Sequence, residues 1–439
     1  MSRDREYAPR MSLFTPPSVT PRRIGFISTR FHGTDGVTLE ACKWAHILQG
    51  MGHECFWMAG LLDLPPAVSH YAPLAYFNHP RVAALHPKLF GVTTRTRAVT
   101  SEIQAIKDVL KDELYRFIEK YKLEVLIPQN ILAIPMHVPL GLAMTEVIAE
   151  TGLPTIAHHH DFAWERERFI VSAVNDYLRA AFPGGLPGVE HVVINSMAQK
   201  ELARRCSLAS AIIPNILDFE TPAPGLDSYS ADLRREIGLA ETDWFILQPT
   251  RVVARKGIEH AIELVRRLND PRAKLVISHP AGDEGDAYMQ MLRDRIEDAK
   301  IDVRFIADRV AEQRGTNAAG RKLYTLNDVY PHADLVTYPS HYEGFGNAFL
   351  EAIYFGKPIV VNAYAVFARD IDPLGFKTIA MSQLVTRQVV EQTRVVLEHR
   401  SLRDEWAKIN YDLCVKYFSY SVARRKLAAR LANLFGEGV

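Results

Sequence analysis

Short apolar runs alternate along the chain with longer stretches of helical spacing. Arg23–Ser28 and Glu54–Ala59 have the length and composition of buried strands, and Val37–Gly52 between them repeats apolar residues at helical intervals. This alternation predicts a parallel sheet that is covered by helices on both faces. The other elements predicted in the first half are strands at Glu124–Pro128, Pro154–Ala157 and His191–Asn195 and a helix at Ser101–Tyr121.

The alternation stops near the middle of the chain and then restarts. Composition changes between Asp218 and Tyr229, where Thr221–Gly225 has the proline and glycine content of a linker. We therefore predict two doubly wound α/β domains, over residues 22–220 and 230–415. The second half has predicted strands at Trp244–Gln248, Lys274–Ser278, Val303–Ile306, Ala333–Thr337 and Lys357–Val361, and helices at Gly257–Leu268, Ala287–Ala299 and Ser401–Phe435.

Composition fits this two-domain organisation and excludes several classes of protein. The 439 residues are 48% hydrophobic and 23% charged, and the formal net charge of +1 gives no electrostatic footprint for nucleic acid. Residues 1–21 have charges and prolines but no apolar segment, so we expect a disordered leader and not a signal peptide. Prolines and polar residues interrupt the most apolar stretch, Val125–Ala149, which excludes it as a membrane span.

The four cysteines Cys42, Cys55, Cys206 and Cys414 are far apart and form no disulfide or metal-binding pattern. We expect reduced thiols in a cytoplasmic protein that has no metal centre, no nucleic-acid partner and no integral membrane association. The oligomeric state stays open.

Loops that follow strands are where doubly wound domains bind their ligands, and one such loop stands out. Glu343–Glu351 follows a strand at Leu335–Tyr338. Gly344 and Gly346 let the backbone approach a ligand closely, and a helix beginning near Asn347 would direct free N–H groups at a diphosphate. The two terminal glutamates can bind sugar and ribose hydroxyls. Equally, they can be a solvated carboxylate and an acid favoured at a helix N-terminus.

A second loop carries two cations. Arg251 and Lys256 lie five residues apart in Gln248–Gly257, between a predicted strand and helix. Converging on a diphosphate, they would stabilise the charge of a departing leaving group and replace a divalent ion. Taken alone, exposed loop charges are the simpler explanation.

These two segments resemble a known family. Two glutamates separated by seven residues, the Gly-Phe-Gly after the first of them, and Ala352–Val361 beyond are similar to the hallmark of retaining GT-B glycosyltransferases of the sucrose-phosphate-synthase-like and glycogen-synthase-like family. Gln248–Gly257 resembles the strand–loop–helix of that family. The resemblance implies two Rossmann-like domains facing across a cleft, with a final helix over residues 416–439 that packs back toward the first domain. It also implies that Glu343 and the backbone of Gly344–Asn347 hold the donor hexose and phosphate, and that Glu351 holds the ribose.

Two loops of the first half resemble the family more weakly. Phe31–Thr38 stands where the family has a glycine-rich loop reaching toward donor and acceptor, although an ordinary tight turn would explain it as well. Ile156–Arg166 contains three consecutive histidines. Neighbours on an extended chain point alternately, so they cannot all bind one ion. His160, followed by Asp161, resembles the histidine of the family that contacts the transferred sugar or acceptor; otherwise these are packed or solvated histidines.

Two segments depart from the family. Asn362–Asp370 stands where the family often has Gly-Gly-x-x-Glu, so the identity of the donor base does not carry over. Arg309–Asn327 is atypical and receives no functional assignment.

We therefore expect a retaining hexosyltransferase that moves mannose or glucose from a nucleotide diphosphate sugar, GDP-mannose or UDP-glucose, to a hydroxyl of a small polar acceptor such as a sugar or compatible-solute precursor. No cofactor or metal is expected. The alternatives are a nucleotide-sugar 2-epimerase of the same architecture and a non-catalytic nucleotide-sugar-binding protein; a dinucleotide oxidoreductase lacks support because no GxGxxG follows the first strand. The predicted catalytic residues are Arg251, Lys256, Glu343 and His160; the donor-binding residues are Gly36, Gly344, Phe345, Gly346, Asn347 and Glu351; the acceptor-binding residues are His158, His159, Asp161 and Arg166.

Overall fold

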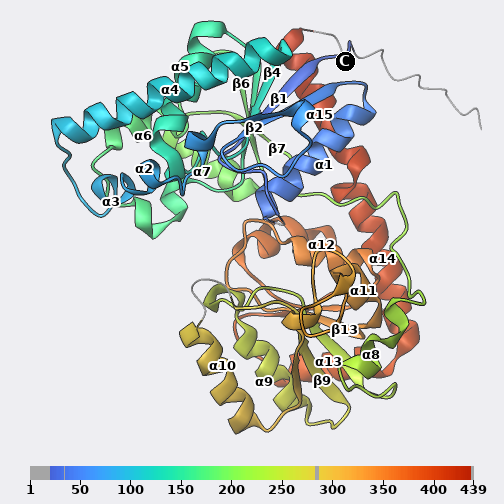
Figure 1. Cartoon of the computed structure of the whole chain (residues 1–439). Coiled ribbons are helices and arrows are strands. Elements are labelled where there is room, and N and C mark those ends of the chain that lie inside the picture. Colours follow the sequence, from blue (N-terminus) through green and yellow to red (C-terminus); the bar gives the residue numbers. More distant parts are fainter. Residues whose placement is uncertain (1–19, 34, 282–285, 437–439) are drawn as a thin grey trace, which may run out of the picture.

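The computed structural model describes residues 20–33, 35–281 and 286–436, so most of the expected leader lies outside it. Two α/β domains are stacked along the molecule, and two C-terminal helices run beside them (Figure 1). Among the described residues, no helix combines the length and hydropathy that a bilayer-spanning segment requires.

The N-terminal domain is built on a seven-stranded parallel sheet with the order β3-β2-β1-β4-β5-β6-β7. Its strands are β1 Arg23–Ile27, β2 Glu54–Ala59, β3 Ser69–Tyr71, β4 Val125–Pro128, β5 Thr155–His159, β6 Val189–Val193 and β7 Ser210–Ile212. Its helices are α1 Gly36–Gly50, α2 Pro80–Ala83, α3 His86–Leu89, α4 Arg97–Tyr121, α5 Val138–Thr151, α6 Asn175–Ala181 and α7 Ser196–Cys206.

Each face of this sheet has its own hydrophobic layer. On one face Leu126 packs with Ile106 and Leu110, which α4 presents at helical spacing. On the other face Phe26 packs with Trp44 of α1. Strands buried on both faces explain the continuous apolar runs of the sequence.

The C-terminal domain repeats this plan with a six-stranded parallel sheet of order β10-β9-β8-β13-β14-β15. Its strands are β8 Trp244–Gln248, β9 Ala273–Ile277, β10 Val303–Phe305, β13 Leu335–Tyr338, β14 Ile359–Asn362 and β15 Ile379–Met381. Its helices are α8 Leu233–Glu236, α9 Ile258–Leu268, α10 Asp286–Ala299, α11 Leu326–Val329, α12 Asn347–Tyr354, α13 Arg387–Glu398 and α14 Arg400–Phe418.

The atypical segment Arg309–Asn327 contains a small antiparallel hairpin. Its strands are β11 Gly315–Thr316 and β12 Lys322–Leu323. The Tyr229 hydroxyl, just beyond the linker, donates to the Leu323 carbonyl at 2.7 Å. The segment is therefore tied to the start of the C-terminal domain.

The predicted fold class is confirmed. The pattern missed the strands β3, β7 and β15, each only three residues long and at a sheet edge. The stretch of helical pattern over Ser401–Phe435 forms two helices in the structure. Ser419 has an extended backbone, with φ −85° and ψ 167°, and its hydroxyl accepts from the Val422 N–H, so it ends α14 and caps a new helix.

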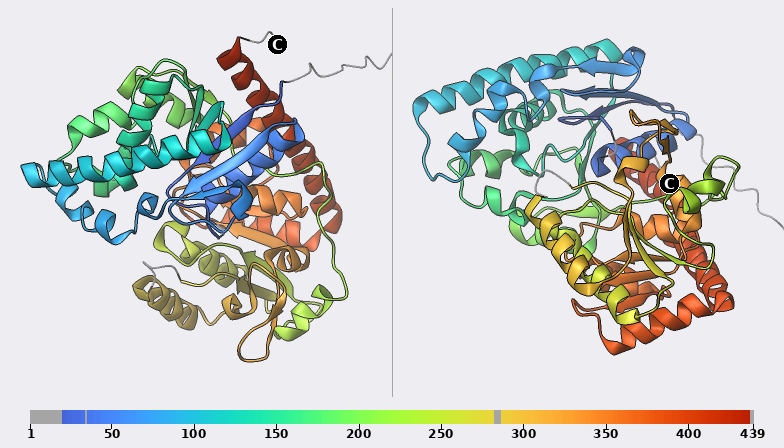
Figure 2. Two further views of the ribbon diagram at one scale, coloured as in Figure 1. Left: turned by 45° about the horizontal axis from the view of Figure 1, so that its top comes forward. Right: turned by 60° about the horizontal axis from the view of Figure 1, so that its bottom comes forward.

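That new helix, α15 Tyr420–Phe435, leaves the C-terminal domain and lies on the N-terminal one (Figure 2). Leu427 and Leu431 are buried in the same cluster as Trp44 and Phe26. α15 therefore forms part of the first domain's core, although it ends the chain.

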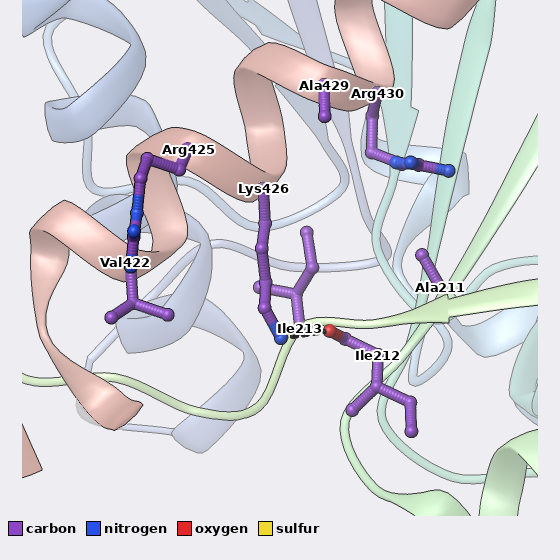
Figure 3. A pocket seen from close by; sticks show the side chains of 8 residues that line it. All are labelled: Ala211, Ile212, Ile213, Val422, Arg425, Lys426, Ala429 and Arg430. Carbon is purple, nitrogen blue, oxygen red and sulfur yellow. Dashed lines mark hydrogen bonds between the residues drawn. The ribbon is translucent and has the colours of Figure 1, made fainter. Parts of the chain in front are cut away.

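A hollow of about 410 Å³ lies between α15 and the edge strand β7 (Figure 3). Lys426 Nζ crosses this space to donate to the Ile212 carbonyl at 2.7 Å. The lining has no carboxylate or hydroxyl side chain, and its charged groups are Arg425, Lys426 and Arg430. It is lined by Ala211, Ile212, Ile213, Val422, Arg425, Lys426, Ala429 and Arg430.

Leu427→Ala should destabilise the N-terminal domain, because it leaves a cavity between α15 and the sheet. Leu427 is 0% exposed, and truncations of this kind cost roughly 2–5 kcal/mol. Urea unfolding followed by tryptophan fluorescence measures the effect, since Trp44 and Trp57 lie in the same cluster. Val415→Ala on α14, where the side chain is 39% exposed, is the control and should change stability by less than about 0.5 kcal/mol. Equal midpoints for the two variants would contradict this packing.

Candidate active site

The loops that follow the strands of the two domains meet at the domain interface. Asn195, directly after β6, donates from Nδ2 to the Gly344 carbonyl at 2.8 Å. Asn215, beyond β7, donates from Nδ2 to Asn347 Oδ1 at 2.7 Å. The carboxyl ends of both sheets, where doubly wound domains bind ligands, therefore face each other.

Glu343 and Lys256 form a buried ion pair on the C-terminal side of this interface. Their residues are 9% and 8% exposed, and Lys256 Nζ contacts Glu343 Oε1. Arg255 Nη1 lies 3.2 Å from the other carboxylate oxygen. Burial alone would raise the pKa of Glu343, but the charges of Lys256 and Arg255 outweigh it and lower that pKa. Glu343 is therefore an ionised carboxylate at neutral pH.

Positive charge exceeds negative charge around this pair. Burial lowers the pKa of Lys256, and the nearby charges of Arg255 and Arg251 lower it further. The attraction of Glu343 opposes this decrease but does not cancel it. The charge of Lys256 also acts on Glu351, so three cationic side chains face two carboxylates, and positive charge is in excess when Lys256 is protonated. Such a surplus in a partly buried place favours a polyanionic ligand.

The first turn of α12 offers backbone donors beside this charge. Gly346 has φ +127°, and a Cβ at this position would lie 2.4 Å from the Tyr364 hydroxyl, so the turn requires glycine. The Tyr364 hydroxyl donates to the Phe345 carbonyl at 2.5 Å, which holds the loop before α12 in place. No side chain caps the N-terminus of α12, so its first N–H groups remain available to an anion.

Two predicted donor-binding residues have other contacts in the structure. The Phe345 ring is buried against Phe418, with centroids 5.3 Å apart, so only its backbone can face a ligand. The Asn347 amide is engaged by Asn215 and lies beside Gly36, where a Cβ would be 3.9 Å from Nδ2. Gly36 and Asn347 therefore bring the first loop of one domain against α12 of the other.

Glu351 lies inside α12 and is directed at the same interface. Burial raises its pKa, while the Tyr330 hydroxyl, which donates to Oε2 at 2.9 Å, and the charges of Lys43 and Lys256 oppose that rise. Lys43 belongs to α1 and is held by the Ile216 carbonyl at 2.6 Å. Glu351 thus feels a cation from each domain.

The three consecutive histidines are the last two residues of β5 and the first residue after it, and their side chains take two directions. Gln129 Oε1 lies 2.9 Å from His158 Nδ1 and 3.1 Å from His160 Nε2, whereas His159 pairs with His191 at 2.9 Å. His158 and His159 are 0% and 1% exposed, so they support the loop and do not reach its surface. His160 alone is half-buried, and desolvation lowers its pKa to about 4, which leaves it neutral at pH 7.

Asp161 and Arg166, both predicted to bind the acceptor, bind each other. Arg166 Nε donates to Asp161 Oδ2 at 2.8 Å, and Asn130 Nδ2 donates to the other carboxylate oxygen at 2.6 Å. Neighbouring Glu165 accepts from the Tyr342 hydroxyl at 3.1 Å, a further contact between the domains. The guanidinium of Arg166 is therefore already engaged.

A pocket of about 120 Å³ opens beside this loop at the ends of β1 and β4. Arg30 lines it with a side chain that is 39% exposed, and Asp35, which accepts from the Val37 N–H to cap α1, lies 3.5 Å from Arg30. Amide groups of Gln129 and Asn130 line the opposite part. The pocket therefore combines the ion pair of Arg30 and Asp35 with several polar groups.

Four residues of this interface were missed by the sequence analysis: Arg255, Lys43, His279 and Arg30. His279 follows β9, and burial together with the charges of Arg251 and Lys256 lowers its pKa to about 4. The signal that could have found His279 and Arg30 is their position just after a strand. Arg255 and Lys43 carry no such signal, because nothing in the sequence around them distinguishes them from an exposed cation.

Comparison with known proteins agrees with this geometry. Residues 230–412, which include the Lys256–Glu343 pair and α12, match the model of the family "Glycosyl transferases group 1". Over 382 residues the chain is 29% identical to mannosylglucosylglycerate synthase from Petrotoga mobilis, covering 82% of this chain and 86% of that protein. Over 429 residues it is 29% identical to the Thermotoga maritima enzyme of the same name, covering 90% and 96%.

Sucrose-phosphate synthase from Thermosynechococcus elongatus has the same fold, with a TM-score of 0.61 at 13% identity over 95% of this chain and 100% of that one. The chain is a GT-B glycosyltransferase. The predicted GT-B fold is thereby confirmed, and the match over residues 230–412 supports the predicted glycosyltransferase family. Retention of configuration, the donor, and the roles of individual residues in this transferase stay predictions.

The buried histidines should make this glycosyltransferase sensitive to acid. Burial lowers the pKa of His160 and His191 to about 4, and those of His158 and His159 well below the ordinary value. An unfolded histidine titrates near 6.5, so between about pH 6.5 and 4 the unfolded chain binds more protons than the folded one. Stability therefore falls as the pH falls through this window, by on the order of 1 kcal/mol per pH unit for each histidine.

Urea unfolding at several pH values in this window measures the slope. His160→Asn should flatten it, and His399→Asn, at an exposed position on the C-terminal domain, should not. Equal slopes for the two variants would contradict the assignment.

Proposed function

We propose that this glycosyltransferase transfers mannose from GDP-mannose to glucosylglycerate with retention of the anomeric configuration. The observation that carries the proposal is the excess of positive charge around Glu343, beside the uncapped N-terminus of α12 and opposite the loops of the other domain. The printed name of the two relatives states a mannosylated glucosylglycerate as product, and they match this chain over most of their length.

In this mechanism the cations stabilise the departing nucleoside diphosphate. Lys256 has three N–H donors, and its contact with Glu343 leaves two of them for phosphate oxygens. Arg251 and the N–H groups of α12 add further charge stabilisation as the bond to the anomeric carbon breaks. The acceptor hydroxyl then attacks on the face that the diphosphate leaves, which preserves the configuration.

Neutral His160 suits a contact with hydroxyl groups. With a pKa of about 4 it carries one donor and one acceptor nitrogen at pH 7, and the Gln129 amide lies at Nε2. We assign it to positioning the transferred sugar or the acceptor, and not to proton transfer.

The acceptor carboxylate requires a cation, and Arg30 is the best placed one. Arg166 Nε donates to Asp161 Oδ2 at 2.8 Å, whereas Arg30 Nε lies farther, 3.5 Å, from Asp35 Oδ2 and lines the pocket beside Gln129 and Asn130, whose amides can bind sugar hydroxyls. We therefore move the carboxylate-binding role from Arg166 to Arg30.

The function is tested by incubating the protein with GDP-mannose or UDP-glucose, with and without glucosylglycerate. We expect acceptor-dependent consumption of GDP-mannose, and NMR of the product should show the anomeric configuration of the donor. Lys256→Ala should lower kcat/KM by about 10²–10³-fold, as loss of one such charge-stabilising group does; Lys88→Ala, at an exposed position, should not. Donor turnover without acceptor would favour the 2-epimerase, and an inverted product would refute the mechanism.

Arg30→Gln should raise KM for glucosylglycerate by roughly 10–100-fold, because a hydrogen bond to a charged group contributes about 1.5–3 kcal/mol. The neutral analogue glucosylglycerol should be affected little. Arg179→Gln, on the exposed side of α6, is the control. An equal loss with both acceptors would argue against a carboxylate contact.

A further inference from the structure

Three potential metal ligands converge beside the Lys256–Glu343 pair. Glu259 and His260 lie in the first turn of α9, and His341 lies in the loop after β13. One ligand atom from each lies within 4.8 Å of the other two. In the part of the chain that the structure describes, this is the one group of three such residues.

The spacing fits a small ion with tetrahedral coordination. Bonds of about 2.0–2.1 Å from such an ion place any two ligand atoms about 3.3–3.4 Å apart. Glu259 Oε1 and His341 Nε2 are 3.4 Å apart. The His260 and His341 rings are 5.2 Å apart at an angle of 78°, so they approach the shared space from different directions.

Neighbouring groups hold two of these residues in place. The Tyr288 hydroxyl donates to Glu259 Oε2 and accepts from the Ile258 N–H at 2.8 Å, which leaves Oε1 directed at His341. The backbone N–H of His341 donates to the Arg255 carbonyl at 2.8 Å, which holds the loop that carries the imidazole. A partner such as the Tyr288 hydroxyl, which orients a ligating carboxylate, is typical of metal sites.

The donor set selects the class of metal. Two imidazoles and one carboxylate suit zinc and related transition ions, with a fourth position left for water. One carboxylate and two imidazoles fit Mg²⁺ poorly, because Mg²⁺ prefers an octahedral shell of oxygen ligands. We propose that Glu259, His260 and His341 form a binding site for one divalent ion of the zinc class.

A metal ion here would link two loops of the proposed donor site. Glu259 comes three residues after Lys256, and His341 comes two residues before Glu343. Coordination would restrain the β8–α9 loop against the β13–α12 loop, and thereby fix the distance between the cations and the carboxylate. This goes beyond the proposed function, whose chemistry uses no metal.

The test is zinc binding to the untagged full-length protein without nucleotide, so its outcome does not depend on the proposed reaction. After treatment with a chelator and its removal, calorimetric titration with Zn²⁺ should show one site per chain. His341→Ala and Glu259→Gln should each weaken binding at least tenfold. The controls, exposed His399→Ala and half-buried Cys206→Ser, should bind as the wild type does.

Hydrogen exchange provides an independent measurement. Zn²⁺ should slow exchange in the segments around Lys256 and Glu343 of the wild type and not in His341→Ala. Unchanged affinity in both ligand variants, or no saturable binding to the wild type, would overturn the proposal. Loss of binding in Cys206→Ser alone would also overturn it, because the ion would then belong to a thiol.

Discussion

The contact between Lys256 and Glu343 is the interaction on which the arrangement of the site depends. It joins the loops that follow the neighbouring strands β8 and β13 and places both charges out of water. Desolvation of each ion costs several kcal/mol, and mutual attraction compensates for it only when further hydrogen bonds are made. Arg255 supplies one of them, and it also leaves the pair with more positive than negative charge. A polyanionic ligand would neutralise the excess positive charge, and the relief of repulsion between the cations would contribute to the free energy of binding.

Side-chain packing around the loop before α12 fixes the position of the backbone N–H donors of that helix. Gly346 has no room for a Cβ because the Tyr364 hydroxyl lies against it, and Phe345 packs on Phe418 at the end of α14. The next residue, Ser419, begins the helix that returns to the N-terminal domain. The orientation of α12 is therefore coupled, through a few side chains, to the segment that joins the two domains. This coupling gives a physical route by which movement between the domains would reach the loop that is proposed to bind the donor.

The sequence predicted the central strands well because each is buried on both faces and is therefore continuously apolar. Edge strands such as β7 are short and half-covered, so their pattern is indistinguishable from that of a loop. In the site, the strand-following position and the two-glutamate motif identified Glu343 and Glu351. The pairing of Glu343 with Lys256 was not predictable, because residues so far apart in the chain meet only through the strand order of the folded sheet. Phe345 was predicted to bind through its backbone, and the inward direction of its ring against Phe418 was not predictable, because a motif fixes the path of the backbone and says little about which side chain turns inward.

The histidines show most clearly why proximity in sequence and convergence in space differ. The run His158–His160 is the obvious candidate for a metal site, yet alternation along β5 sends His159 to His191 and the other two to Gln129. Burial then favours the neutral rings, and each takes a hydrogen-bonding role.

At the start of α9, by contrast, residues that are distant in sequence converge in space. Glu259 and His260 are neighbours in sequence that form no motif, and His341 becomes a third potential ligand because the turn at Gly257 brings α9 against its loop. The approach is close, since a Cβ on Gly257 would lie 2.5 Å from the Pro339 carbonyl. The close approach of two backbones, which only glycine permits, therefore decides where coordinating groups can gather in this protein.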